Sequence, residues 1–550
     1  MLTLIAGGQL IDPASAIDAK RDLWIRDQTI VDRANDQSSK PKPDQTIDAT
    51  GCVVMAGAID LHTHIGGGKL TLARLLLQDQ FPRGSERASE FLPAASVVGQ
   101  RYLDMGYTTC FEPAVIPCNA RSAHAEMADV NGIDTGGYCL LGNDDVLLQL
   151  LSEDAPQAII NDYVAWMITA TQCIAVKVVN PGGISAFKFN ERAFDVNTPH
   201  PKYGVTPSTI IRRLCRAVHE IGLAHPLHVH CSNLGVPGNI ASTLATVEAA
   251  DGLPIHLTHA QFHSYGDCGP YKMSSAAESL VRILQSHPNV TIDVGQVMFG
   301  QTVTISADSM HQYANRTRAT PRKSVLVDVE CEAGCGVVPF RYRRKRYVHS
   351  LQWAIGLELF LMIDDPKRVF LTTDHPNGGP FTTYPHLIRL LADRSYRETA
   401  LAEIEPEAAA ASQLAGMSRE YSLQEIATMT RSAPAALLGL NNVGRLAPGC
   451  HADVVIYRKQ DNLEQMFAAP EYVIRRGQVV RGPGSVDTTS IVPTTHTADV
   501  DFDPSTIPAL AERYAQQGTM AMERLRISDD EMQGVLGTTL EKHASVRSGD

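Results

Sequence analysis

Histidines at alternating positions are the first feature of this sequence that could support chemistry. His62 and His64 stand in the segment AIDLHTHIGGGK, and His228 and His230 stand in PLHVHCSN. In an extended strand, residues two positions apart project to the same face, so each pair offers two imidazoles on one side. An HxH pair alone is weak evidence, because most such pairs are ordinary surface or core histidines.

Further imidazole and carboxylate groups follow other apolar stretches. The segment IHLTHAQFHSYG offers His256, His259 and His263, and the apolar run of RVFLTTDHPNGGP ends at Asp374. Imidazole and carboxylate are the ligands that borderline divalent ions such as zinc prefer. Each position alone has an ordinary structural explanation, but their recurrence after successive apolar runs favours a metal site.

Lys177 lies in the apolar segment CIAVKVVNPGG. Burial disfavours the ammonium form of lysine. A neutral amine can take up carbon dioxide and become a carbamate, which is an anionic bridge for two cations. The alternative is a lysine whose amine reaches solvent from a strand. The histidines elsewhere in the sequence favour the carbamate.

Eight short apolar segments are predicted to be the strands that position these groups. Segments with helical spacing lie between most of them, for example at 95–103 and 206–221. This alternation predicts an α/β fold, a TIM (β/α)8 barrel, whose chemistry lies at the C-terminal ends of the strands. The predicted strands are Ala58–Leu61, Thr108–Phe111, Gly137–Leu141, Ile174–Val179, Pro226–Val229, Ile255–Thr258, Val290–Val294 and Val369–Thr372.

Strand-rich segments on both sides of the barrel predict a second, small β domain. We expect residues 1–52 and 431–482 to form it together, as antiparallel strands of a β-sandwich, with the barrel at 53–430. Residues 483–550 are predicted to be an irregular C-terminal extension with one amphipathic helix, Pro508–Arg526. That helix either docks a partner or packs on its own barrel.

Composition limits the class of protein. The chain has 550 residues, 44% hydrophobic and 20% charged, which is the balance of a soluble globular protein. Its formal charge of −12 argues against a nucleic-acid partner. The N-terminus has no signal-peptide pattern, and the longest apolar run, Leu351–Ile363, is too short to span a bilayer, so no membrane association is expected.

The cysteines indicate a cytoplasmic location. Eleven are scattered without CxxC pairs, which fits reduced thiols. Cys331 and Cys335 are the one close pair. They are either a metal clip or two ordinary thiols in a loop, and the second interpretation is favoured.

The order of the candidate ligands resembles that of the two-metal amidohydrolases such as dihydroorotases and hydantoinases. Seven segments, from the first strand to the eighth, also resemble the A subunit shared by formylmethanofuran dehydrogenases and the bacterial formyltransferase/hydrolase complex: HTHIGGGK, MGYTTCFEPAV, KVVNPGG, HVHCSNLGVPGN, LTHAQFHSYG, QWAIGLELFL and LTTDHPNGGP. The resemblance implies two zinc ions bridged by carboxylated Lys177. The implied ligands are His62, His64, Lys177, His230, His259 and Asp374.

The resemblance also implies an activity, the reversible hydrolysis of the formamide of formylmethanofuran or formylmethylofuran to formate and the free amine. The chain would work with other subunits of such a complex and with a methanofuran-type one-carbon carrier. Asp374 would serve as both ligand and general base. Asn233 and His263 are candidate substrate contacts, with structural roles as the alternative for each.

A basic run, FRYRRKR, contains Arg343, Arg344 and Lys345. Such runs are usually solvated edge strands. The coenzyme of the resembled family carries a glutamate-rich tail, so a basic cradle for that tail is the functional alternative.

Two other functions stay open. One is a cyclic-amide hydrolase of the hydantoinase or dihydroorotase type, which uses the same metals and is disfavoured only by the loop sequences. The other is a non-catalytic scaffold that holds the coenzyme for partner subunits. The intact set of candidate ligands argues against the scaffold.

Overall fold

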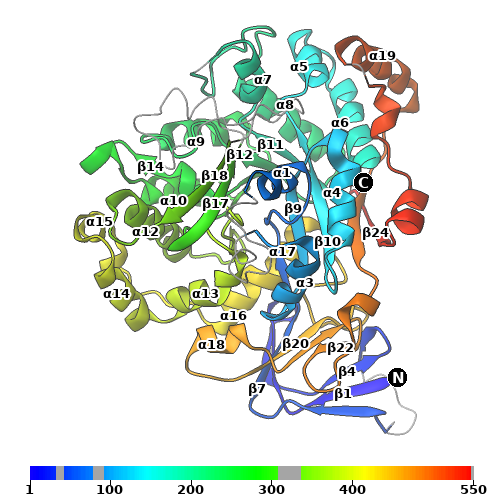
Figure 1. Cartoon of the computed structure of the whole chain (residues 1–550), viewed down its shortest axis with the longest axis vertical. Helices are drawn as coiled ribbons and strands as arrows, with labels where there is room; N and C mark the ends of the chain where they lie inside the picture. The colour runs from blue at the N-terminus through cyan, green and yellow to red at the C-terminus, as the bar shows by residue number, and fades with distance from the viewer. Residues whose placement is uncertain (33–41, 78–91, 192, 307–335, 519, 547–550) are drawn as a thin grey trace.

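Eight parallel strands form the centre of the molecule, and all eight predicted strands are present. The middle of Figure 1 shows part of this sheet. The computed structural model describes residues 1–32, 42–77, 92–191, 193–306, 336–518 and 520–546. In spatial order the strands are β8 (Ala58–Asp60), β9 (Tyr107–Val115), β10 (Asp134–Leu141), β11 (Ala175–Val179), β12 (Leu227–His230), β13 (Ile255–Leu257), β16 (Val290–Asp293) and β19 (Val369–Phe370).

The sheet curls until its first and last strands approach each other beyond their ends. Thr63 and His375 form a parallel bridge, and the backbone N–H of His64 donates to the His375 carbonyl at 2.9 Å. The Thr372 hydroxyl donates to the His62 carbonyl at 2.7 Å. The predicted TIM-type barrel is confirmed, and it is joined at the mouth where the candidate ligands lie.

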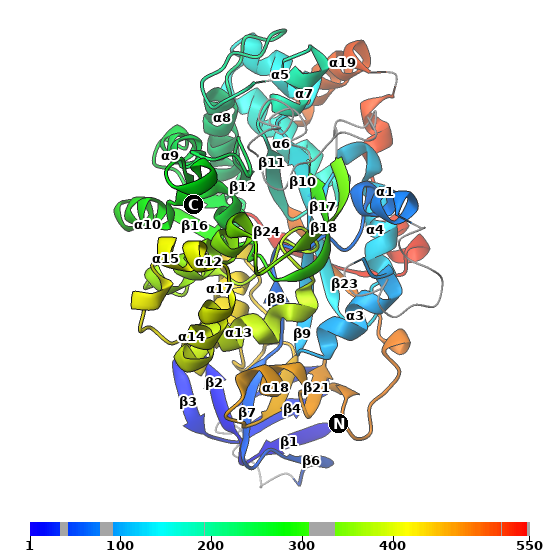
Figure 2. The same ribbon diagram turned by 60° about the vertical axis from the view of Figure 1, so that its left-hand side comes forward.

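Helices cover the outside of the curled sheet (Figures 1 and 2). The predicted helices at 95–103 and 206–221 are found as α3 and α8. Within the described residues, no helix is both long and apolar enough to cross a membrane. The helices of the barrel region are α1 (Gly68–Leu76), α3 (Ala95–Leu103), α4 (Ala120–Ala128), α5 (Asp145–Ser152), α6 (Gln157–Thr171), α7 (Gly183–Lys188), α8 (Pro207–Glu220), α9 (Ile240–Ala249), α10 (Ala277–Ser286), α12 (Tyr347–Met362), α13 (Tyr384–Ala392), α14 (Arg394–Glu403), α15 (Pro406–Ala411), α16 (Leu423–Ala427) and α17 (Ala433–Leu438).

Strands from both sides of the barrel segment build the predicted second β region, at the bottom of Figure 1. One sheet has the order β5-β4-β1-β6, and the other has the order β22-β21-β20-β7-β2-β3. The prediction of antiparallel strands was partly wrong, because β1 pairs with β6, and β2 with β7, in parallel. The domain boundaries stay a prediction. The strands are β1 (Leu2–Ala6), β2 (Gln9–Asp12), β3 (Ile17–Lys20), β4 (Leu23–Arg26), β5 (Thr29–Val31), β6 (Gln45–Asp48), β7 (Cys52–Ala56), β20 (Val454–Arg458), β21 (Tyr472–Arg475) and β22 (Gln478–Arg481), with α18 (Leu463–Ala468) between β20 and β21.

The C-terminal segment is more ordered than its sequence suggested. Two strands, β23 (Thr494–Asp499) and β24 (Thr539–Ala544), extend the barrel sheet from the N-terminal end of β10. The predicted helix Pro508–Arg526 was too long. Helix α19 (Ile507–Gln517) ends before Gly518, and only a 3₁₀ turn, Met522–Leu525, follows.

A buried arginine joins the six-stranded sheet to the barrel. Arg475 at the end of β21 places its guanidinium 2.7 Å from Asp134 Oδ1 and 2.5 Å from Asp453 Oδ2. It also donates from Nε to the Gly132 carbonyl at 3.0 Å. Its side chain is 1% exposed. Removing one member of such a group leaves a buried charge uncompensated.

We therefore expect Arg475→Ala to lower the free energy of unfolding by about 3–5 kcal/mol, because the buried Asp453 loses its ion-pair partner and the buried Asp134 loses one of its two arginines. The measurement is urea-induced unfolding followed by fluorescence. Arg481→Ala is the control. Arg481 lies on the neighbouring strand, β22, and forms a surface ion pair with Asp104. This variant should lower the free energy of unfolding by no more than about 1 kcal/mol. Equal losses for the two variants would contradict a special role of the buried group.

Candidate metal centre

The end of the first barrel strand and the end of the eighth bring three candidate ligands together. Asp374 Oδ1 lies 3.0 Å from His62 Nε2 and 3.6 Å from His64 Nε2. One donor atom from each of these residues lies within 4.8 Å of the others. His62 and Asp374 are buried, and His64 is partly buried.

Three more imidazoles form a second cluster. His230 at the end of β12 lies with its ring centroid 4.5 Å from that of His259. His263 is 5.2 Å from each of them, and donor atoms of all three lie within 4.8 Å of one another. The ring centroids of His259 and His62 are 5.6 Å apart, so the two clusters adjoin.

Lys177 lies among these groups. It is in the middle of β11, is 2% exposed, and pairs in register with His228 of β12. Its charge is among the causes that lower the pKa of His259, after burial and the neighbouring imidazoles. It also opposes the charged form of His62. This one side chain therefore acts electrostatically on both clusters.

Asp293 contacts His62 of the first cluster on the side of the ring away from Asp374. It was not among the residues predicted from the sequence. Its Oδ2 lies 3.1 Å from His62 Nδ1 and 3.1 Å from His256 Nε2, and its Oδ1 accepts from the His259 backbone N–H at 2.7 Å. Burial opposes the charge of Asp293, but His62 and His256 outweigh burial and lower its pKa. A signal was present, because Asp293 is an acidic residue that ends the apolar strand VTID.

Glu112 orients His64 in the same way, through a hydrogen bond to Nδ1. It was not predicted from the sequence either. Its Oε1 accepts from His64 Nδ1 at 2.8 Å, and its Oε2 accepts from the backbone N–H groups of Ile65 and Gly66 at 2.8 and 3.1 Å. A carboxylate at Nδ1 keeps the proton there and leaves Nε2 free to bind a metal. The signal was a glutamate inside the otherwise uncharged strand YTTCFEPAV.

The protonation states differ among these groups. Burial is the largest cause that lowers the pKa of His228, His256 and His259. The pKa of His62 is instead raised, because Asp293 and Asp374 outweigh burial and Lys177. Burial raises the pKa of Asp374, but His259 and His62 outweigh it and keep the carboxyl ionised. Neutral imidazoles and ionised carboxylates are the forms that coordinate cations.

The donor set therefore fits a pair of divalent ions. Imidazole nitrogens, carboxylate oxygens and a lysine that can be carboxylated are borderline ligands of the kind zinc prefers. Nδ1 of the buried His259 has no hydrogen-bond partner among the described residues. A bound ion would also relieve the crowding of several imidazoles in a dry space.

Local backbone conformations aim these ligands. His259 (φ 37°) and Asp374 (φ 51°) adopt the left-handed region, which is unfavourable for residues with a side chain and tends to occur at functional sites. Gly295 allows the seventh strand to pass closely, because a Cβ there would lie 2.3 Å from His259 Cβ. The site thus depends on the turns that follow the strands as well as on the strands.

The other predicted site residues lie elsewhere or have different contacts. Asn233 donates from Nδ2 to the Ser242 hydroxyl on α9 at 2.9 Å, which is a structural contact. In the basic run, the Arg344 side chain forms an ion pair with Glu403. Lys345 Nζ donates to the Ile404 carbonyl at 3.2 Å. His263 joins the second cluster, while the substrate roles of all these residues stay predictions.

The basic run is only partly an edge strand. Its first three residues end β18 (Gly336–Tyr342), which pairs with β17 (Gly300–Ser306), and the rest forms the turn before α12. Cys331 and Cys335, the possible metal clip, lie outside the described residues.

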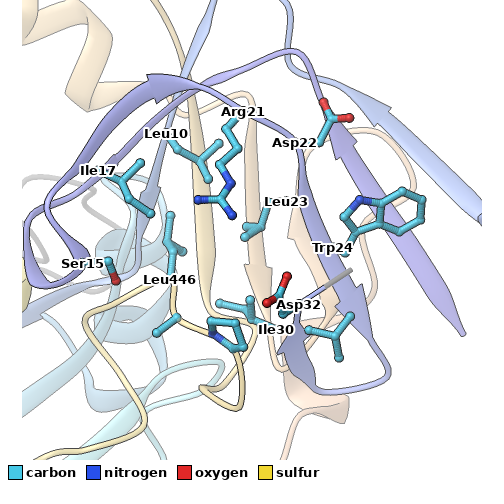
Figure 3. A pocket seen from close by; sticks show the side chains of 13 residues that line it. Leu10, Ser15, Ile17, Arg21, Asp22, Leu23, Trp24, Ile30, Asp32 and Leu446 are labelled. Carbon is cyan, nitrogen blue, oxygen red and sulfur yellow. The ribbon is translucent and has the colours of Figure 1, made fainter. Parts of the chain in front are cut away.

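A cavity of about 390 Å³ lies away from both clusters, in the small β region (Figure 3). Apolar side chains such as Leu10, Leu23 and Leu446 line it together with Arg21 and Asp32. None of the candidate ligands lines this cavity. No histidine among the described residues lines it either.

The chain is similar to known proteins. Residues 45–481 match the Amidohydrolase family. The A subunit of the formyltransferase/hydrolase complex Fhc from Methylorubrum extorquens is 46% identical over 497 residues, covering 88% of this chain and 89% of that protein. Protein FwdA from Methanocaldococcus jannaschii is 35% identical over 558 residues, covering 96% and 97%. The crystal structure of FhcABCD from M. extorquens in complex with methylofuran contains a chain with TM-score 0.90 and 41% identity, covering 99% of this chain and 100% of that one.

We expect Glu112→Gln to weaken zinc binding by about 10–100-fold, the usual effect of losing a carboxylate behind a histidine ligand. The new amide would donate to His64 Nδ1, which favours the tautomer with its proton on Nε2, the nitrogen that faces Asp374. The measurement is competitive titration with a zinc chelator, together with the hydrolytic rate, which should recover in excess zinc.

The matched control is Glu358→Gln. Glu358 is a buried glutamate on α12 that accepts from the Gln413 backbone N–H at 2.7 Å and contacts Ser275. Unchanged zinc affinity in Glu112→Gln, or an equal loss in Glu358→Gln, would show that Glu112 does not orient the ligand.

Proposed function

The chain belongs to the amidohydrolase family, together with the A subunit of the formyltransferase/hydrolase complex, and from that membership we propose that it is a binuclear zinc hydrolase acting on a formamide. The substrate proposed is the formamide of a formylmethanofuran or formylmethylofuran. The products are formate and the free amine, and the reaction is reversible.

One observation carries this proposal: two adjoining ligand clusters share the C-terminal mouth of the barrel, with Lys177 among them. His62, His64 and Asp374 make the first cluster, and His230 and His259 belong to the second. We propose that Lys177, as a carbamate, bridges the two ions. Its burial and its influence on His62 and His259 support that assignment.

Bound divalent cations would polarise the formyl carbonyl and activate water near neutral pH. The protein's own part is positioning and proton transfer. Asp374 directs Oδ1 at His62 and His64, and we assign its second oxygen, Oδ2, to accept a proton from the attacking water and return it to the leaving amine. Its lowered pKa keeps it ionised at neutral pH.

The relatives support the choice of substrate and partners. The 46% identical relative belongs to a formyltransferase/hydrolase complex, and the chain with TM-score 0.90 comes from an assembly bound to methylofuran. We propose that this chain likewise joins other subunits and meets a methanofuran-type carrier. The basic run is proposed to face the acidic tail of that carrier, although Arg344 already pairs with Glu403.

We expect the purified, zinc-replete protein to release formate from N-formyl-2-(aminomethyl)furan and to leave hydantoin and dihydroorotate unopened. The measurement is formate release against ring opening under the same conditions, with His62→Ala as the inactive control. Faster ring opening would favour the cyclic-amide hydrolase. Tight carrier binding by zinc-replete protein without any formate release would favour the non-catalytic scaffold.

A second test separates metal binding from proton transfer at Asp374. Asp374→Asn should keep much of its zinc, because the amide oxygen still coordinates weakly, while hydrolysis falls by about 10²–10⁴-fold, the usual range for a lost general base. His62→Ala should instead lose zinc together with activity. Zinc content and rate are measured on the same preparations. A zinc-replete Asp374→Asn protein with wild-type turnover would leave Asp374 a ligand only.

A further inference from the structure

A third group of imidazole and carboxylate side chains lies at the other end of the barrel. His496 is on β23, and Glu541 and His543 are on β24, the neighbouring parallel strand. His496 pairs in register with Glu541. Residues two apart on a strand share a face, so His543 lies beside Glu541 on the same side. The segment Glu541–His543 therefore presents two ligand types in the spacing of an HxH pair.

The distances are those of a ligand set. One donor atom from each of the three residues lies within 4.8 Å of the others. His496 Nδ1 and His543 Nε2 are 3.0 Å apart. Two nitrogens bound to one tetrahedral zinc at about 2.0 Å would be separated by about 3.3 Å. A small movement of either ring would place both nitrogens on the same ion.

The tautomers of the two rings bear on this site. Burial lowers the pKa of His543, and the backbone of Gly439 opposes that shift, as a carbonyl that accepts from a protonated ring nitrogen would. We assign the proton of the neutral His543 ring to the nitrogen facing Gly439, which leaves Nε2 with a lone pair directed at His496.

His496 then has two unfavourable choices. With its proton on Nδ1 it donates to His543, but its bare Nε2 is buried and lies 4.0 Å from the carboxylate oxygen of Asp134. With its proton on Nε2 it faces Asp134 favourably, but two lone pairs meet at 3.0 Å. His496 Nε2 has no hydrogen-bond partner among the described residues. A cation between the two rings satisfies both lone pairs and lets the Nε2 proton face Asp134.

The side chains of the group are in forms that can bind a cation. Burial lowers the pKa of His496 to about 4, so its ring is neutral. Burial raises the pKa of Glu541, but its hydrogen bond with His451 and the charge of Arg476 outweigh burial and bring the value to about 2. His451 Nε2 lies 3.4 Å from Glu541 Oε2. Arg476 Nη2 lies 3.4 Å from Glu541 Oε2. The positive charge of Arg476 is balanced by Asp134, whose Oδ2 lies 3.3 Å from the same nitrogen.

We propose that His496, His543 and Glu541 bind one structural transition-metal ion of the zinc class. The ion fastens β24 to β23, and with them the C-terminal segment to the start of β10. Glu541 and His543 are only half-buried, so water reaches the fourth position. Residues at the N-terminal face of a TIM barrel serve stability, so no catalytic role is assigned to this ion.

The test is elemental analysis of full-length protein desalted from zinc-containing buffer. Wild type is expected to hold one zinc per chain more than His543→Gln, with formamide hydrolysis unchanged because the mouth of the barrel is untouched. Glu541→Gln is the second variant and should lose the same ion. The matched control is His219→Gln, an exposed histidine on α8, which should keep the wild-type zinc content.

A measurement on unmodified protein completes the test, so that misfolding of a variant does not decide the result. Crystals of wild type should show an anomalous peak at the zinc edge between His496 and His543. Equal zinc content in wild type and both folded variants would overturn the proposal. So would crystals with zinc at the barrel mouth and no peak between these two rings. The group would then be a hydrogen-bonded clamp only.

Discussion

The arrangement of the barrel mouth depends on the interactions of one buried carboxylate, that of Asp293. It lies between His62 and His256 and also accepts from the backbone of His259. A carboxylate placed there without partners would be expensive to desolvate, and the imidazoles around it would repel one another if charged. The Asp293 carboxylate and the surrounding imidazoles stabilise one another, because the carboxylate accepts a proton from His62 Nδ1 and so directs Nε2 toward Asp374. One acidic residue on the seventh strand thereby orients a ligand of the first strand and the turn after the sixth.

The same reasoning applies to all the buried ionisable side chains at the barrel mouth, because each depends on the charges of the others. Lys177, His228 and His256 are buried within one layer of the barrel, and each disfavours the charged form of its neighbours. A protein interior tolerates such crowding when opposing charges are close. Asp293 and Glu112 supply part of that compensation, and bound cations with a carbamate would change the balance again. This crowding is one of the observations behind the proposal that the clusters form a metal centre.

Much of this could be predicted from sequence because it rests on periodicity and order. All eight barrel strands were found from short apolar segments, since parallel strands are buried on both faces. The candidate ligands follow those strands, and the structure gathers them. Asp293 and Glu112 were not predicted, because each acts on ligands that belong to other strands, and the spacing of residues along the chain does not reveal such contacts. Strands β23 and β24 were missed because their polar residues, such as Thr494 and Lys542, break the apolar pattern expected of a strand.

Asp134 is the centre of a polar network at the N-terminal end of the barrel, opposite the mouth that holds the candidate ligands. Its Oδ1 accepts from the Thr494 backbone N–H at 3.0 Å and pairs with Arg475. It thus links β23, the six-stranded sheet and β10. This network lies at the start of β10, whereas the other end of the strand pairs with β11 beside Lys177. A loss of contacts at Asp134 should therefore disturb the docking of the C-terminal segment and the small β region before it reaches His62 or Asp374. Function at the mouth and stability at the base are thus carried by separate polar networks, which share the strands between them.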